Sequence, residues 1–230
     1  RTVCEAITAA ACGLLGLEQT ELQAEFRPAL TEAGQLGEEA EIYIYDTLSG
    51  GAGFARHVNN LGNRLFDRAL NLLTDCPENC DRSCYRCLRS YKNKFEHESL
   101  DRFLGAMLLR YLLEGGEPAI DVERLSKFDD LLYEDLCRQD RNDLTIDRNV
   151  TMNVEEIGNI EVPILITNHS GNQLVIATHS GLTPDYAPTK ELRDLSEFSI
   201  LPVRLVDEII VRNNLPTATR CVLDLISTSQ

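Results

Sequence analysis

Apolar residues recur at helical spacing along much of the first half of the chain. This spacing predicts helices over residues 3–15, 54–72, 100–112 and 122–136. Ser99 or Glu98 is expected near the start of the third helix, and Gly115-Gly116 ahead of Pro118 is expected to end it. Residues 40–47 instead alternate isoleucine with tyrosine, which predicts a strand with Ile42 and Ile44 on one face.

The pattern changes after the Gly-Gly-Pro segment, and we therefore expect two domains, residues 1–117 and 118–230. Three apolar stretches, 149–154, 160–167 and 173–179, predict a small antiparallel sheet with a tight turn at 168–172. Short helices are expected near 205–211 and 216–226. The predicted fold class is α+β: a helix-rich domain with a short sheet, then a smaller α+β domain with an antiparallel sheet.

Composition narrows the class of protein. An apolar fraction of 43 % in 230 residues allows a sizeable core, and no long uncharged apolar run predicts a membrane span. The start lacks an initiator Met and is already helical in pattern, so we expect a piece of a longer polypeptide. The net charge of −15 repels phosphate, so any nucleic-acid contact must be local.

Four of the eight cysteines lie within twelve residues: Cys76, Cys80, Cys84 and Cys87. Cys84-x-x-Cys87 has the spacing of a zinc hook, and the other two cysteines can supply the remaining ligands of a tetrahedral Zn²⁺ ion. Four thiolates leave no position for water, so the zinc is expected to be structural rather than catalytic. Its apparent binding free energy of about 10–16 kcal/mol would match or exceed the stability of a typical domain, about 5–15 kcal/mol.

Three alternatives for this cluster stay open from the sequence: two disulfides or free thiols, an iron–sulfur cluster, or His97 in place of one cysteine. The other cysteines, Cys4, Cys12, Cys137 and Cys221, are scattered through helical segments and are expected to be small buried hydrophobes. No secreted disulfide framework is indicated, which favours a reducing cytoplasm.

A basic segment follows Cys80, the second cysteine of the cluster. Five positive residues stand against the single acid Asp81 between positions 80 and 94, and the candidate nucleic-acid-binding residues are Arg82, Arg86, Arg89, Lys92, Lys94 and Tyr85. If residues 82–92 were helical, most of these charges would share one face. With Tyr91 they could hold a single strand by phosphate contacts and stacking. Equally, they could only neutralise the thiolates and the acidic surface.

A glycine-rich turn, Asp46 to Phe54, links the predicted strand to the next helix. Gly50, Gly51 and Gly53 can present backbone N–H groups to an anion or to a neighbouring domain. They can also serve only a tight turn that needs positive φ. The turn has neither the lysine of a P-loop nor the spacing of a dinucleotide fingerprint.

Three ordered motifs carry a resemblance to a known family: Tyr45–Phe54 (YDTLSGGAGF), Ser83–Asn93 (SCYRCLRSYKN) and His97–Arg102 (HESLDR). They resemble the cysteine-rich C-terminal domain of prokaryotic superfamily-two helicases, including DNA-repair helicases and DISARM anti-phage defence proteins. The resemblance covers residues 1–115. It implies a zinc-binding domain that accompanies an ATP-driven motor acting on DNA, with motor domains in the same chain or in a partner subunit.

No complete catalytic motif accompanies these features, and the expected function is a non-catalytic module that contacts DNA, most simply single-stranded, and docks on a helicase. The alternative is a structural scaffold for protein–protein assembly. A third possibility is a degenerate nuclease fold in residues 120–230, although an Asp147–Glu161 metal pair would lack its lysine because position 163 is proline.

Overall fold

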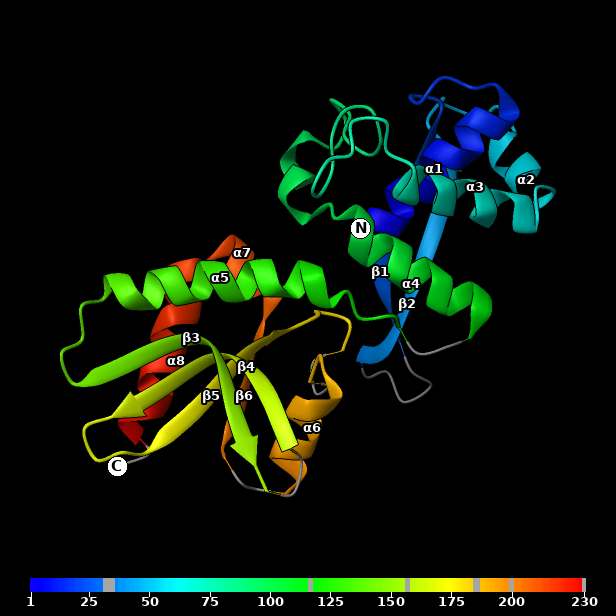
Figure 1. The fold of residues 1–230 in the computed structure, drawn as a ribbon. Coiled ribbons are helices and arrows are strands. Elements are labelled where there is room, and N and C mark those ends of the chain that lie inside the picture. Colours follow the sequence, from blue (N-terminus) through cyan, green and yellow to red (C-terminus); the bar gives the residue numbers. More distant parts are fainter. Residues whose placement is uncertain (31–35, 116–117, 156–157, 184–186, 199–200, 229–230) are drawn as a thin grey trace. The chain divides into compact units, whose positions relative to one another are not determined.

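The computed structural model describes residues 1–30, 36–115, 118–155, 158–183, 187–198 and 201–228. The chain divides into two compact units, Arg1–Pro118 and Ala119–Gln230 (Figure 1). Both units combine helices with a sheet, which confirms the α+β class. No helix in the described ranges is both long enough and apolar enough to cross a membrane.

The first unit is built on three helices and a two-stranded ribbon. Its elements are α1 (Thr2–Leu15), β1 (Leu22–Leu30), β2 (Leu36–Asp46), α2 (Phe54–Asn59), α3 (Asn63–Thr74), the 3₁₀ helix η1 (Lys94–Ser99) and α4 (Arg102–Glu114). Helix α1 packs against α3 and α4, and their buried faces meet around Ile7, Leu73 and Leu109. At Gly105 the contact is so close that a Cβ would lie 2.5 Å from Thr2 Cγ2, so only glycine fits there.

One local expectation for this unit was wrong, and the start of another helix is now defined. The predicted helix 54–72 is two helices, because Gly62 adopts φ 54° and ψ −140°, a conformation outside the helical region. Helix α4 is capped by Asp101, whose side chain accepts hydrogen bonds from the backbone N–H groups of Phe103 and Leu104. Ser99 and Glu98, which were expected near the start of this helix, lie just before it in η1.

The β1–β2 ribbon is antiparallel and pairs Ala24 with Ile44 and Phe26 with Ile42. The strand alternation that the sequence indicated is therefore present. The strand starts earlier than expected, at Leu36. A loop was expected around Gly34 and Gly37, but Gly37 belongs to the strand, and Gly34 lies outside the described residues. Ile44 packs on the core, whereas Ile42, farther along the ribbon, is 42 % exposed.

The second unit has a four-stranded sheet. Its elements are α5 (Val122–Arg138), β3 (Leu144–Val154), β4 (Gly158–Asn168), β5 (Gln173–His179), α6 (Lys190–Glu197), β6 (Val203–Asp207), α7 (Glu208–Asn213) and α8 (Leu215–Thr228). The strand order is β3-β4-β5-β6. One apolar cluster joins the sheet to α5, α7 and α8, and a second joins it to α6.

The sheet is mixed, which corrects the antiparallel expectation. Strands β3, β4 and β5 are antiparallel, but β6 runs parallel to β5 after the crossover through α6. A helix was expected over residues 205–211. Residues 208–211 are helical and belong to α7, whereas residues 205–207 belong to β6. A short apolar run fits either structure. Val203 and Leu205 pack with one apolar cluster and Val206 with the other, so tertiary burial on both faces makes residues 203–207 a strand.

The strand register also separates the two carboxylates considered for a nuclease. Asp147 pairs with Leu165, four residues along β4 from Glu161. At about 3.4 Å per residue, this offset places the two residues roughly 14 Å apart along the strands. They therefore do not form a shared metal site.

A buried carboxylate, Asp129 of α5, ties that helix to β5. Its side chain is enclosed, and Oδ1 accepts the backbone N–H of Thr178 at 2.7 Å. Burial raises the pKa of Asp129 to about 6. An unfolded aspartate has a pKa of about 3.9, so the folded unit binds the proton more tightly and is penalised when the group ionises.

We expect Asp129→Asn to stabilise the second unit at pH 7, by about 1–3 kcal/mol. The amide oxygen can still accept the Thr178 N–H without carrying a charge. In the unsubstituted protein this group's penalty should disappear as the pH falls from about 7 to 4. Urea denaturation at several pH values measures both effects, with the exposed Asp147→Asn as the matched control. A variant that is less stable at pH 7 and has an unchanged pH profile would contradict this reading.

Candidate metal centre and the surface beside it

The first pair of cysteines lies on the turn that follows α3. The backbone N–H of Asn79 donates to the carbonyl of Cys76 at 2.9 Å, which closes a tight turn. Asn79 adopts φ 43°, a left-handed conformation that asparagine tolerates better than most residues. The three residues between Cys76 and Cys80 thus reverse the chain, so that both sulfurs face the same point, 3.6 Å apart.

The second pair lies on an even tighter turn. The carbonyl of Cys84 accepts the backbone N–H groups of Cys87, Leu88 and Arg89. The backbone N–H of Cys84 points to the sulfur of Cys87 at 3.1 Å, and that of Arg86 points to the sulfur of Cys84 at 3.4 Å. Such N–H groups stabilise thiolates, as in metal-binding turns.

The four sulfurs have the spacing of ligands around a single ion. Adjacent Sγ atoms are separated by 3.6, 3.6, 3.7 and 3.8 Å, and all four lie within 4.8 Å of one another. A tetrahedron with zinc–sulfur bonds of about 2.3 Å has edges of about 3.8 Å. The donor set therefore fits one zinc ion, which the four sulfurs would enclose completely.

The same distances bear on the alternatives. All four cysteines are free, and their sulfurs are far beyond the disulfide length of about 2.05 Å. An iron–sulfur cluster distributes its thiolates over several iron atoms, which requires a wider spread of sulfurs. His97 is not in the cluster: its Nε2 contacts the carbonyl of Ser90 at 3.1 Å and Asn93 Oδ1 at 3.0 Å.

The thiols cannot all ionise without a cation. Burial raises the pKa of Cys76, but N–H groups of Cys80 and Glu78 outweigh it and bring the pKa down to about 7. Burial and the neighbouring sulfurs raise the pKa of Cys80 to about 12. A divalent ion would remove this conflict by neutralising part of the charge on the four sulfurs.

Arg102, the first residue of α4, joins the metal turn to the helices. It is 4 % exposed, and its guanidinium donates to the carbonyl of Cys80 at 2.7 Å. It also donates to the carbonyls of Leu73 and Thr74 at the end of α3, and to Asn79 Oδ1. One side chain thus satisfies the C-terminus of α3 and fixes the first cysteine turn.

Asn93 performs a similar task for the second turn and is 3 % exposed. Its Nδ2 donates to the carbonyl of Leu88 and to Glu5 of α1, both at 2.9 Å. Its Oδ1 accepts the backbone N–H of Ser90 at 2.8 Å. The loop that carries the basic residues is therefore fixed to α1 by a buried amide.

The basic segment is not a helix: residues 82–92 form turns, so the condition for a single charged face is not met. Three of its charges are bound within the fold. Arg82 donates to the carbonyl of Glu98, Arg89 to Ser83 Oγ at 2.9 Å, and Lys92 to the carbonyls of Gln19 and Thr20. By contrast, Arg86 and Lys94 are exposed. Arg86 lies 3.8 Å from Glu78, also at the surface.

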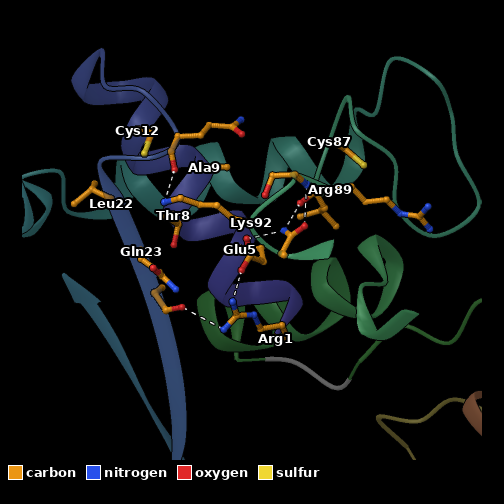
Figure 2. A pocket seen from close by; sticks show the side chains of 15 residues that line it. Arg1, Glu5, Thr8, Ala9, Cys12, Leu22, Gln23, Cys87, Arg89 and Lys92 are labelled. Atoms are coloured by element: carbon orange, nitrogen blue, oxygen red, sulfur yellow. Dashed lines mark hydrogen bonds and ion pairs between the residues drawn. The ribbon is translucent and has the colours of Figure 1, made fainter. Parts of the chain in front are cut away.

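Figure 2 shows the pocket between α1, β1 and this loop, where Glu5, Arg89 and Lys92 line the wall. Its volume of about 50 Å³ has room for a few water molecules rather than for a nucleotide. Lys92 spans it to reach the end of the α1–β1 connection. We therefore regard the pocket as a packing feature.

The glycine turn is closed by a carboxylate of the chain itself. Asp46 accepts the N–H of Gly53 at 2.8 Å and that of Ala55 at 2.9 Å. Gly50, Gly51 and Gly53 have φ between 72° and 88°, which explains why the turn needs glycine. Two of the three glycine N–H groups are thus already bound within the turn, that of Gly53 to Asp46 and that of Gly51 to the carbonyl of Leu48, and a contact of the turn with an anion or a neighbouring domain stays a prediction.

Sequence reasoning gave no role to Arg102, Asn93 or Asp46, although all three lie in the motifs that carry the resemblance. Polar residues at such positions give no periodic signal; the partners of Arg102 and one partner of Asn93, Glu5, are far away in sequence, whereas Asp46 acts within its own turn. Sequence reasoning also gave no role to Phe95, the most exposed large apolar side chain among the described residues. Two of the scattered cysteines, Cys137 and Cys221, are exposed rather than buried.

Two comparisons identify the class of domain. Residues 3–88, which include all four clustered cysteines, match the family model described as the MrfA Zn-binding domain. The expected resemblance is confirmed: this part of the chain is similar to a zinc-binding domain, and zinc is the cofactor that the match and the sulfur cluster both support.

A relative in Escherichia coli (strain UMEA 4076-1), Druantia protein DruE, is 38 % identical over 135 residues. The alignment covers 55 % of this chain and only 7 % of that relative, so the likeness concerns a small part of a much longer protein. No solved structure matches the chain.

Replacing Arg102 by lysine should destabilise the first unit by about 2–4 kcal/mol, because an ammonium cannot satisfy the buried carbonyls of both Leu73 and Cys80. Release of zinc to a chromogenic chelator should become about tenfold faster or more. Arg110→Lys, at an exposed position of the same helix, is the matched control. Equal stability and equal release rates in the two variants would show that Arg102 does not hold the metal turn.

Proposed function

We propose that this chain is a non-catalytic, zinc-stabilised module of a DNA helicase or of its partner, which contributes to DNA binding and assembly in phage defence or DNA repair. The observation that carries the proposal is the set of four sulfurs spaced for one ion, within a region that matches a zinc-binding domain. The likeness to a Druantia protein supports the defence setting.

The proposed zinc ligands are Cys76, Cys80, Cys84 and Cys87. Zinc bound there would supply a rigid cross-link between the end of α3 and the two loops that follow. The chain's own contribution is to present the thiolates, to point N–H groups at them and to hold both turns through Arg102 and Asn93. The absence of disulfides among the eight cysteines supports a reducing cytoplasm as the location.

DNA is the proposed partner on the surface beside the metal, since the basic segment is a local exception in a chain of net charge −15. Arg86, Lys92 and Lys94 are exposed in this segment, and Lys92 donates to the carbonyls of Gln19 and Thr20, so Arg86 and Lys94 are the charges proposed to meet phosphates. Helicase motor domains, in the same polypeptide or in a partner subunit, are the second partner. Apolar residues exposed on α4, such as Tyr111 and Leu112, suit such docking.

A scaffold without DNA contact is the second candidate. Two observations favour it: most basic residues of the segment bind within the fold, and α4 exposes Leu108, Tyr111 and Leu112 together. The two candidates share the zinc site and differ in whether the loop surface meets a nucleic acid.

Metal analysis of protein purified without chelators should find one zinc per chain. Cys84→Ser should lower that content and unfold the first unit, because the metal's contribution is comparable to the stability of a whole domain. Cys137→Ser, at an exposed site outside the cluster, should change neither. The second unit has its own apolar core and should keep its unfolding transition. Full folding of a metal-free first unit would refute the structural zinc.

Binding to a 20-nucleotide oligothymidine, followed by fluorescence anisotropy, tests the DNA contact. Two or three phosphate contacts predict an affinity that falls about five- to tenfold or more between 50 and 200 mM salt. Arg86→Glu with Lys94→Glu should abolish binding. Lys127→Glu with Lys190→Glu, at exposed sites of the second unit, changes the net charge equally and should leave binding intact. If the zinc-loaded chain does not bind at low salt, the scaffold candidate is favoured.

A further inference from the structure

The surface beside the metal turns exposes an unusual group of rings. Phe95, Tyr91 and Tyr85 are 89, 78 and 68 % exposed, and no other large apolar residue in the described ranges is as exposed. All three are aromatic, and they occur within eleven consecutive positions. Exposed apolar residues are normally scattered, so a concentration of this kind indicates a binding surface.

These rings are held in place rather than loosely attached. Lys94 Nζ lies 4.4 Å from the centroid of the Tyr91 ring and 4.9 Å from that of Phe95. The Tyr85 ring packs edge-on against His97 with centroids 5.4 Å apart. Between these residues the backbone is fixed by the buried amide of Asn93. The fold thus keeps the rings in fixed positions while leaving most of their surface open.

Neither the metal nor the core accounts for these side chains. None of the three belongs to the apolar cluster of the first unit, and none supplies a ligand atom to the sulfur site. Arg82, Arg89 and Lys92 are bound within the fold, which leaves Arg86 and Lys94 as the charges that accompany the rings. Lys92 is exposed as well, and the exposed acids Glu78, Asp81 and Glu98 lie in the same segment, so the rings are the part of this surface that no fold contact and no charge balance explains.

We propose that Tyr85, Tyr91 and Phe95 form a platform on which the bases of a single-stranded nucleic acid stack, while Lys94 and Arg86 contact its phosphates. This inference rests on the proposed DNA-binding function and specifies its mode. In a duplex the bases are stacked on one another, so aromatic rings gain contact only with a single strand. Binding of this kind depends on the bases and tolerates any sequence.

Three ligands of equal length separate stacking from charge: oligothymidine of 20 nucleotides, the same length of abasic phosphodiester, and a duplex. The zinc-loaded full chain should bind oligothymidine at least about tenfold more tightly than either of the others. Tyr91→Ala with Phe95→Ala should weaken oligothymidine binding by about 10- to 100-fold and leave abasic binding unchanged. Zinc content and the thermal transition of this variant should equal those of the unsubstituted chain.

Phe26→Ala with Phe198→Ala removes two exposed aromatic side chains elsewhere and is the matched control; its binding should be unchanged. If the unsubstituted chain binds oligothymidine and abasic strand equally, DNA binding stands but the platform is refuted. The same follows if the Tyr91/Phe95 variant binds oligothymidine normally. If none of the three ligands binds, the DNA-binding function itself fails, and the rings then belong to a protein interface.

Discussion

Four sulfurs that would repel one another as thiolates are brought within 4.8 Å, and this is the constraint on which the first unit depends. Burial and the neighbouring sulfurs raise the pKa of Cys80, so a bound cation would relieve the repulsion among the thiolates. The fold supports the cluster from outside through Arg102, which fixes the first turn, and Asn93, which fixes the second. Metal and hydrogen bonds thus act on the same two turns from opposite sides.

The charges of the basic segment divide into two groups that composition alone cannot distinguish. Arg82, Arg89 and Lys92 donate to acceptors within the chain, so reversing their charge would damage the loop rather than test a ligand contact. Lys94 and Arg86 remain at the surface, and Lys94 lies against two exposed rings. A count of positive residues therefore overstates the electrostatic attraction that this surface offers to phosphate.

The sequence was sufficient for features that depend on spacing. The helix expected over residues 3–15 is present as α1, and the four clustered cysteines bring their sulfurs together as their spacing indicated. Helical periodicity and metal-ligand spacing are local properties of the sequence. Features set by distant partners were not accessible. Gly62 breaks a helix that the apolar pattern would continue, and β6 becomes a strand only because β5 and two apolar clusters lie beside it. Arg102 appears in the sequence as an ordinary charged residue at the start of a helix.

Phe95 is 89 % exposed although it belongs to a regular element, η1. The metal site offers a physical explanation for this exposure. A loop normally gains its order by burying side chains, and the loop from Cys76 to Leu100 buries few: Cys76, Ser83, Cys87, Leu88, Asn93 and Leu100. Cross-linking by a metal does not require apolar burial, since the bonds to sulfur replace it. The aromatic side chains of such a loop need not support its fold and remain free to meet a ligand. On this view the zinc site and the exposed rings are two parts of one arrangement, in which the metal provides the rigidity that the rings would otherwise have to provide by packing inward.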